Sequence, residues 1–368
     1  MPVRKSWDIL SKINLHQRDS CVSFEEKAHK YRINGSIEGW KSVTEFLSKF
    51  HDKFNPNKAA SMVVNSRRYK EGTHNLSKKT KDEIISFWET ENKRGTSLHA
   101  RMERSMNRKY HLKLRSDRHS SEELLFEKRI VKFADEKRLV MYSKKDNEVY
   151  VCDSSSDIDP FPDTFLGFLW KDNTVRRNPR EDSELGDDEP VLRYPEAVIE
   201  TEQVKGFWLT HSHLKPYRSE WVVWDEEWKI AGTIDAVCKD ERDGSYWILD
   251  WKRVRNGLQV DLDAIKWGYI PDEDEYLDYP KSYGKMMPAP LDDIHITKYW
   301  NYSLQLNLYR EILEKNYGIK IKGMMLVQFH PEIGSMVRVH KVVRLEEPMK
   351  RILSTASPSP EQEVQVCH

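Results

Sequence analysis

The chain has 368 residues, of which 38% are hydrophobic and 33% charged, and its formal net charge at pH 7 is zero. This length and apolar content suffice for one large folded domain or two. No run approaches the roughly 18 apolar residues of a membrane-spanning helix, which argues against a membrane protein. The four cysteines are far apart and form no CxxC pair, so neither a zinc knuckle nor a disulfide framework is indicated.

The N-terminal residues contain no apolar stretch of the kind found in signal peptides. We therefore expect a soluble intracellular protein of the cytoplasm or nucleus, with no membrane partner. The opening MPVRKSWDILSKI is basic and amphipathic, but Asp8 argues against an organelle transit peptide, so mitochondrial targeting is not expected.

The charges are unevenly distributed along the chain. Residues 1–150 hold 33 Lys and Arg against 21 Asp and Glu, whereas residues 151–368 hold 27 against 39. A basic first half suits contacts with phosphates, and an acidic second half suits carboxylates gathered around a cation. Solvated surface is the alternative interpretation of the same asymmetry.

The first predicted elements are a hairpin and a helix. Residues 21–35 alternate apolar and polar side chains around a turn, which predicts a β-hairpin. Ser42 opens a short apolar helix through Phe50. Residues 61–80 are polar and basic and are expected to form a loop or helix at the surface.

Two longer helices are predicted next. A helical pattern begins at Thr80 and continues to about Met106, which places His99 on that helix. A second amphipathic helix is predicted over 124–134, and a hairpin over 138–152. The acidic stretch over about 153–202 is rich in Pro and Ser, lacks a sustained period and predicts an inserted loop.

Three extended runs follow in close succession and predict an antiparallel meander: 221–224, 229–237 and 246–251. Beyond an irregular segment over 255–298, a helix is predicted from Trp300 to Tyr317, closed by Gly318. A buried strand is expected over 321–329.

The expected fold is α/β, a mixed β-sheet with an antiparallel meander flanked by helices. Residues 1–75 are predicted to form an N-terminal hairpin and helix extension. The core is expected over 76–350, interrupted by the insert around 153–202, and residues 354–368 are expected to be a disordered tail.

Two carboxylates at strand ends suggest a cation site. Asp235 ends one run of the meander and Asp250 ends the next, so neighbouring strands bring both to one edge of the sheet. Mg²⁺ prefers such oxygen ligands, and it can assist phosphodiester hydrolysis. Any single Asp-x-Lys at a strand end is usually just solvated, so the prediction depends on the whole set.

Lys252 completes this constellation. Because side chains alternate across a strand, Lys252 emerges on the same face as Asp250, two residues earlier. It can then contact the attacking water or the scissile phosphate. Trp251 points to the other face, and its backbone carbonyl is a candidate metal ligand.

Four motifs occur in a recognisable order: GTSLH (95–99), GTIDAV (232–237), ILDWK (248–252) and QLNLY (305–309). In this order they resemble the RecB-like and lambda-exonuclease-like branch of the PD-(D/E)XK nuclease superfamily. The segment over 24–47 is similar to the N-terminal hairpin and helix of phage-type and large-DNA-virus-type members. The resemblance implies a restriction-endonuclease-like core.

The resemblance also implies roles for individual residues. His99, Asp235 and Asp250 would bind the metal, Lys252 would be catalytic, and Gln305 and Tyr309 would brace the site and contact DNA. Gln305 and Tyr309 are i and i+4 on one helical face. These roles have structural alternatives. His99 could be a core histidine, and Gln305 and Tyr309 could simply belong to an amphipathic helix.

Further candidates surround this set. Glu220 resembles an acidic residue that many relatives carry at the first strand of the meander. The resemblance implies that it binds the metal directly or through a water molecule. Arg218, Arg253 and Arg255 are candidates for gripping phosphates, and Tyr302 for base stacking. Solvated surface arginines are the alternative.

The implied cofactor is Mg²⁺ or Mn²⁺, and a histidine ligand suits Mn²⁺. Relatives with an iron–sulfur cluster have three cysteines clustered after the Gln-helix, where this chain has only Cys367, so no iron–sulfur cluster is expected.

The sequence thus predicts a metal-dependent deoxyribonuclease, an exonuclease or single-strand-preferring enzyme of recombination, repair or replication. Its partner is DNA, single-stranded or at duplex ends. The alternatives are an RNA endonuclease of the cap-snatching type and a nucleic-acid-binding module without turnover. The oligomeric state is left open.

Overall fold

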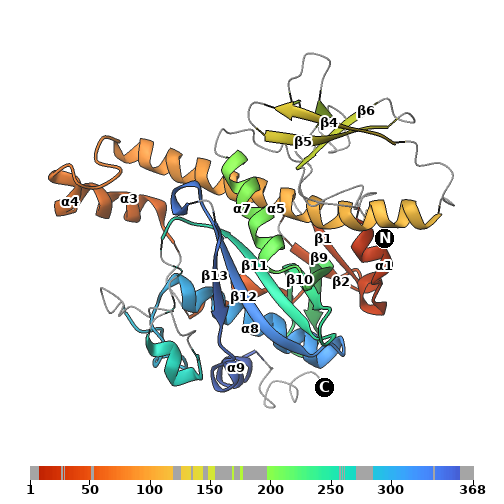
Figure 1. Cartoon of the computed structure of the whole chain (residues 1–368). Coiled ribbons are helices and arrows are strands. Elements are labelled where there is room, and N and C mark those ends of the chain that lie inside the picture. The colour runs from red at the N-terminus through yellow and green to blue at the C-terminus, as the bar shows by residue number, and fades with distance from the viewer. Residues whose placement is uncertain are drawn as a thin grey trace.

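The structure is a computed structural model of the whole chain (Figure 1). It describes residues 8–118 except 26–27, 29 and 51–53, and residues 197–356 except 257, 259, 261, 271–284 and 335. Between these parts it describes only five strands, within 126–176. The predicted tail beyond residue 356 lies outside the described residues.

The central sheet is mixed and contains the predicted meander. Strands β9 (Leu214–Asp225), β10 (Ile230–Asp240) and β11 (Tyr246–Arg253) pair antiparallel in that order. Next to β11, β12 (Ile321–Phe329) runs parallel, and β13 (Arg338–Val342) pairs antiparallel with β12. The short β3 (Lys41–Ser42) runs parallel to β10. The meander prediction is confirmed.

Helices cover both faces of this sheet (Figure 1). On one face lie α5 (Lys81–Arg118) and α7 (Ala197–Thr210). Leu98 and Met102 of α5 and Phe207 of α7 form a buried cluster with Leu249 and Trp251 of β11. The prediction of a mixed sheet flanked by helices is therefore confirmed.

The other face is covered by α2 (Val43–Leu47), α8 (Lys298–Asn316) and α9 (Glu346–Leu353). Phe46, Leu304 and Met349 belong to the large core cluster on this side, together with Ile234 of β10 and Ile248 of β11. The predicted helix and the strand at 321–329 are confirmed, and Gly318 takes the positive φ of +65° that ends α8.

The N-terminal residues are integral to this fold. After α1 (Ile9–Ile13) and the 3-10 turn η1 (Gln17–Cys21), β1 (Val22–Glu25) and β2 (Lys30–Ile33) form the predicted hairpin. Ser42 caps α2 as predicted, but the helix ends at Leu47, before Phe50. Since β3 joins β10, the segment predicted as an extension contributes to the central sheet.

The basic stretch over 61–80 begins within α3 (Pro56–Asn65) and continues through α4 (Arg67–Lys70) into turns. The next helix, α5, begins beside the predicted Thr80 and continues beyond Met106 to Arg118. It is 38 residues long and carries His99 near its middle.

One predicted helix is wrong. Residues 126–133 form strand β4 (Phe126–Phe133), which pairs antiparallel with β5 (Glu136–Ser143), and β5 pairs with β6 (Glu148–Asp153) as in the predicted hairpin. The β-branched residues Ile130 and Val131 favour a strand, and pairing with β5 satisfies its backbone groups.

Two further short strands, β7 (Phe168–Leu169) and β8 (Val175–Arg176), complete this second sheet. They fall in the predicted insert over 153–202, whose last residues begin the unpredicted α7. Most of that insert lies outside the described residues. In the irregular segment over 255–298 the structure has the short turn η2 (Leu262–Trp267).

Within the described part of the chain, no helix combines the length and the apolar character needed to cross a membrane.

Candidate metal centre

Three acidic residues lie side by side on three adjacent strands. In the β9–β10 ladder, Trp221 pairs with Ile234 and Ser219 with Ala236, which places Glu220 opposite Asp235. The β10–β11 ladder ends at the pair Ala236 and Leu249, so Asp235 and Asp250 are the next residues on the two strands. The antiparallel meander therefore gathers carboxylates that are up to 30 residues apart in sequence.

His99 of α5 reaches these carboxylates from the face of the sheet that α5 covers. Its Nδ1 lies 3.5 Å from Oδ2 of Asp235 and 4.0 Å from Oε1 of Glu220. Among the described residues, His99, Glu220 and Asp235 form a group whose ligand atoms all lie within 4.8 Å of one another. All three side chains are partly exposed, so an ion in solution has access to them.

Glu220 has an unusual backbone. Its φ is +43°, in the left-handed region that residues with a side chain seldom adopt. Such a conformation costs about 1–3 kcal/mol and persists where the surroundings impose it, often at functional sites. Here it lies in the middle of a paired strand, and it turns this carboxylate toward His99.

Asp250 is paired with Lys252 instead of belonging to the group around His99. Nζ of Lys252 lies 2.7 Å from Oδ2 and 2.9 Å from Oδ1 of Asp250, as the alternation along β11 predicts. The ammonium also lies 4.3 Å from the centre of the Tyr302 ring. Tyr302 thus contacts the predicted catalytic lysine, and its role in base stacking stays a prediction.

Burial changes the protonation behaviour of this pair. Asp250 is almost fully buried, and burial raises the pKa of its carboxyl to about 6 although Lys252 opposes the shift. Burial also disfavours the charge of Lys252. The carboxylates of Asp250 and Asp235 outweigh this effect and hold the pKa of Lys252 above its ordinary value.

Trp251 links the two strands at this point. Its backbone N–H donates to Oδ2 of Asp235 at 2.8 Å, which fixes the carboxylate beside His99. Its ring is fully buried on the opposite face against Phe207 and Phe329. The predicted orientation of the ring is confirmed, and the role of its carbonyl as a ligand stays a prediction.

Gln305 and Tyr309 belong to α8, which covers the face of the sheet toward which Lys252 points. Nε2 of Gln305 donates to the Tyr309 hydroxyl at 3.3 Å. Burial raises the pKa of Tyr309 well above its usual value, and Asp235 and Asp250 are close enough to raise it further. The pair therefore lies close to the carboxylates, and its bracing role stays a prediction.

Gly232 makes this approach possible. A Cβ at position 232 would lie 2.6 Å from a ring carbon of Tyr309 and 2.8 Å from a methyl carbon of Val43. Neighbouring Thr233 pairs its hydroxyl with that of Tyr31 at 3.0 Å. Tyr31 was not predicted from the sequence. Because it lies about 200 residues from its partner, only the fold brings it to the site.

Arg218, predicted to contact a phosphate, is buried in an ion pair within the protein. Its guanidinium is buried, lies 2.8 Å from Oδ2 of Asp19 and donates to the carbonyl of Asn14. It also packs over the Trp221 ring. These contacts attach the N-terminal segment to β9, and they leave the side chain turned into the protein.

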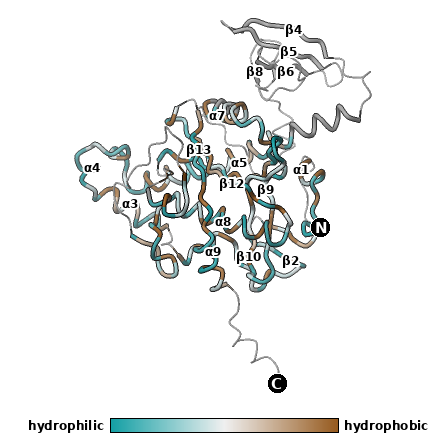
Figure 2. Tube along the Cα trace, turned by 60° about the horizontal axis from the view of Figure 1, so that its bottom comes forward, coloured by the Kyte–Doolittle hydropathy of each residue, from teal (hydrophilic) through white to brown (hydrophobic). Residues whose placement is uncertain are grey.

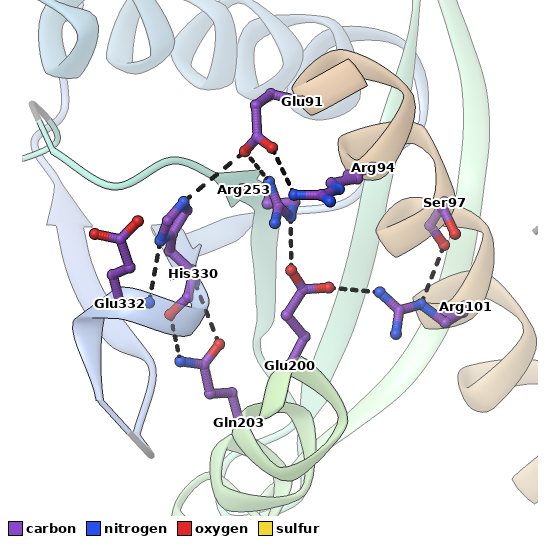
Figure 3. Close-up of polar contacts among 9 residues, drawn as sticks. All are labelled: Glu91, Arg94, Ser97, Arg101, Glu200, Gln203, Arg253, His330 and Glu332. Carbon is purple, nitrogen blue, oxygen red and sulfur yellow. Dashed lines mark hydrogen bonds and ion pairs between the residues drawn. The ribbon is translucent and has the colours of Figure 1, made fainter. Parts of the chain in front are cut away.

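Arg253 is likewise buried instead of facing a ligand. Figure 3 shows its guanidinium between Glu91 of α5 and Glu200 of α7, and it contacts both carboxylates, with 2.6 Å to Glu200. Glu200 also pairs with Arg101 at 2.6 Å. The network was not predicted, because its members come from three separate elements.

Figure 3 also shows how the end of β12 joins this network. Gln203 of α7 donates to the carbonyl of His330 and accepts from its backbone N–H. Arg253 follows Lys252 by one residue, and Glu91 lies two turns before His99. The network therefore fixes the helix that carries His99 against the strand that carries Lys252. Arg255 is half exposed and pairs with Glu332 at 2.9 Å.

The donor set fits a divalent cation. Two carboxylates and one imidazole offer hard oxygen and borderline nitrogen ligands, a combination suited to Mn²⁺ and acceptable to Mg²⁺. The sequence prediction included Asp250 in this set. The structure places Glu220 in the group around His99 and Asp250 in the ion pair with Lys252, one strand away.

Comparisons of the chain with known protein families and with curated proteins gave no match.

Proposed function

We propose that this chain is a divalent-metal-dependent nuclease that hydrolyses DNA phosphodiester bonds, with a restriction-endonuclease-like core of the PD-(D/E)XK type. One observation carries the proposal. The cation-binding group of His99, Glu220 and Asp235 adjoins the Asp250–Lys252 pair on neighbouring strands of one sheet.

In this proposal His99, Glu220 and Asp235 hold the ion, with Asp250 at its edge. When bound, Mg²⁺ or Mn²⁺ supplies a Lewis acid that neutralises charge on the phosphate and favours deprotonation of water. Asp235 is held for this task by the Trp251 N–H, and Glu220 by its left-handed backbone.

Lys252 acts on the substrate in this proposal. Its ammonium is oriented by Asp250 and by the face of Tyr302, and part of it is exposed beside the metal-binding group. From there it can donate a hydrogen bond to the attacking water or to a phosphate oxygen. A fixed positive charge aimed at developing negative charge lowers the barrier of such reactions.

The test is digestion of end-labelled DNA, linear and circular, single-stranded and duplex, with matched RNA, in Mg²⁺, Mn²⁺ or EDTA. We expect metal-dependent cleavage of DNA, and survival of circles if the enzyme needs an end. Cleavage of RNA but not of DNA would show that the substrate is RNA. Binding of DNA without cleavage in either metal would contradict the proposal and favour a binding module.

A further inference from the structure

A basic arm lies at the N-terminal end of α5. We define it as residues 54–81, which contain α3, α4, the following turns and the first residue of α5. It has one acidic side chain, Glu71, and seven basic ones: Lys58, Arg67, Arg68, Lys70, Lys78, Lys79 and Lys81. Figure 1 shows α3 and α4 projecting beside the start of α5, away from the central sheet.

The arm carries an excess of positive charge, which Asp82 and Glu83 at the start of α5 offset in part. Arg67 pairs with Glu71, and none of the other six makes an ion pair with a described residue. Four of those six, Lys58, Arg68, Lys70 and Lys78, are exposed. In Figure 2, α4 and the turns near it are hydrophilic along most of their length. Such a surface attracts a polyanion.

The arm has a defined framework that holds these charges in place. Ala60, Leu76 and Ile84 form a small buried cluster between α3, the turns and α5. The Tyr69 hydroxyl donates to the carbonyl of Lys79 at 2.6 Å, and Ser66 caps α4. The basic side chains are therefore presented by an ordered backbone, which lowers the entropic cost of binding.

The arm and the metal-binding group share one helix. From Lys81 to His99 there are 18 helical steps of about 1.5 Å, so the arm begins about 27 Å along α5 from His99. This corresponds to about eight base-pair steps of duplex DNA at about 3.4 Å each. Since the acidic group repels phosphates in the absence of an ion, a cationic surface at this distance would offset that repulsion.

We propose that the basic arm binds the backbone phosphates of duplex DNA about eight base pairs from the bond that is cleaved. The position of that bond rests on the proposed nuclease function, whereas the binding of DNA by the arm does not. An anionic membrane could also attract the arm. DNA is favoured because the arm is attached without a break to the helix that carries His99.

The experiment measures binding of labelled hairpin duplexes of about 6 and about 20 base pairs by fluorescence anisotropy, in EDTA and over a range of salt concentrations. The arm variant is Arg68→Gln/Lys70→Gln/Lys78→Gln. The matched control, Lys239→Gln/Lys320→Gln/Lys350→Gln, removes three exposed charges elsewhere in the chain. Because all six side chains are exposed, we expect both variants to fold.

The arm variant is expected to bind the long duplex at least about tenfold more weakly, with a slope of log K against log salt reduced by about 2 to 3. Cleavage of the short duplex in Mg²⁺ should change less than about twofold, because a short duplex held at the site does not reach the arm. The control should match the wild type on both.

Equal binding of the long duplex by arm variant and wild type would overturn the proposal, as would an equal loss of binding in the control variant. If the arm variant lost binding to anionic lipid vesicles while its DNA binding was unchanged, the partner of the arm would be a membrane and not DNA. A separate assay of cleavage in Mg²⁺ or Mn²⁺ tests the proposed function, so failure of one proposal is distinguishable from failure of the other.

Discussion

At the scale of single residues, Lys252 is the proposed catalytic group. Lys252→Gln removes the positive charge but keeps a donor that can reach Asp250. We expect the single-turnover cleavage rate to fall at least about a hundredfold, since one oriented donor at a reacting phosphate or acyl group contributes about that much. Tyr302→Phe keeps the ring that packs on the ammonium and should retain most of the rate.

A different result at this residue would be informative. Unchanged cleavage by Lys252→Gln, measured at saturating metal, would contradict the catalytic role. The melting temperature should be recorded beside the rate, because Asp250 is buried and loses its ion pair.

How far the sequence predicted these residues depends on how local the signal is. Asp250 and Lys252 share a face because a strand alternates with period two, and Asp235 is near them because consecutive strands of a meander pair. Which carboxylate faces His99 depends on rotamers and on the left-handed backbone of Glu220. No residue pattern encodes these features, and Tyr31 was missed for the same reason.

At the scale of elements, Gly232 controls how closely α8 approaches β10. Gly232→Ala would place a methyl group 2.6 Å from the Tyr309 ring, so we expect a loss of about 1–3 kcal/mol in the free energy of unfolding. Gly95→Ala is the matched control. It lies within α5 with open space around it, and it should stabilise the protein by about 0.5–1 kcal/mol. Urea unfolding measures both, and destabilisation by both or by neither would contradict this packing.

Arg253 tests the network that joins α5, α7 and β11. Arg253→Gln removes the cation that Glu91 and Glu200 share, although Glu91 keeps Arg94 and Glu200 keeps Arg101. We therefore expect a loss of about 1.5–3 kcal/mol in the free energy of unfolding, as for a hydrogen bond to a charged group. Arg255→Gln, which disrupts a half-exposed pair, should cost less than about 1 kcal/mol. If Arg253→Gln instead weakened DNA binding at unchanged stability, Arg253 would face the ligand as the sequence suggested.

Sequence patterns predicted some of the helices and strands correctly and missed others. The strand at 321–329 and the helix before it were predicted within two residues at each end, because buried apolar runs and a closing glycine mark them. The predicted helix at 124–134 is a strand, because pairing with β5 outweighs an ambiguous local pattern. Helix α7 was missed because it follows an acidic segment without periodicity.

At the scale of the whole molecule, a bound ion should stabilise the folded chain. Binding to the folded state alone adds about 2.7 kcal/mol when free Mn²⁺ is a hundred times Kd, so thermal unfolding should shift upward by several degrees relative to EDTA. Asp235→Asn should lose most of this shift, whereas Asp293→Asn, an exposed carboxylate paired with Arg351, should keep it. Equal shifts of the melting temperature in both variants would show that the ion binds away from Asp235.

The most direct test of the central claim is the time course of cleavage of end-labelled duplex DNA by the wild type and by Asp235→Asn, in Mg²⁺, Mn²⁺ and EDTA. We expect cleavage by the wild type with either metal, none in EDTA, and a rate at least about a hundredfold lower in the variant. Cleavage by Asp235→Asn at the wild-type rate, or no metal-dependent cleavage by the wild type, would contradict the claim.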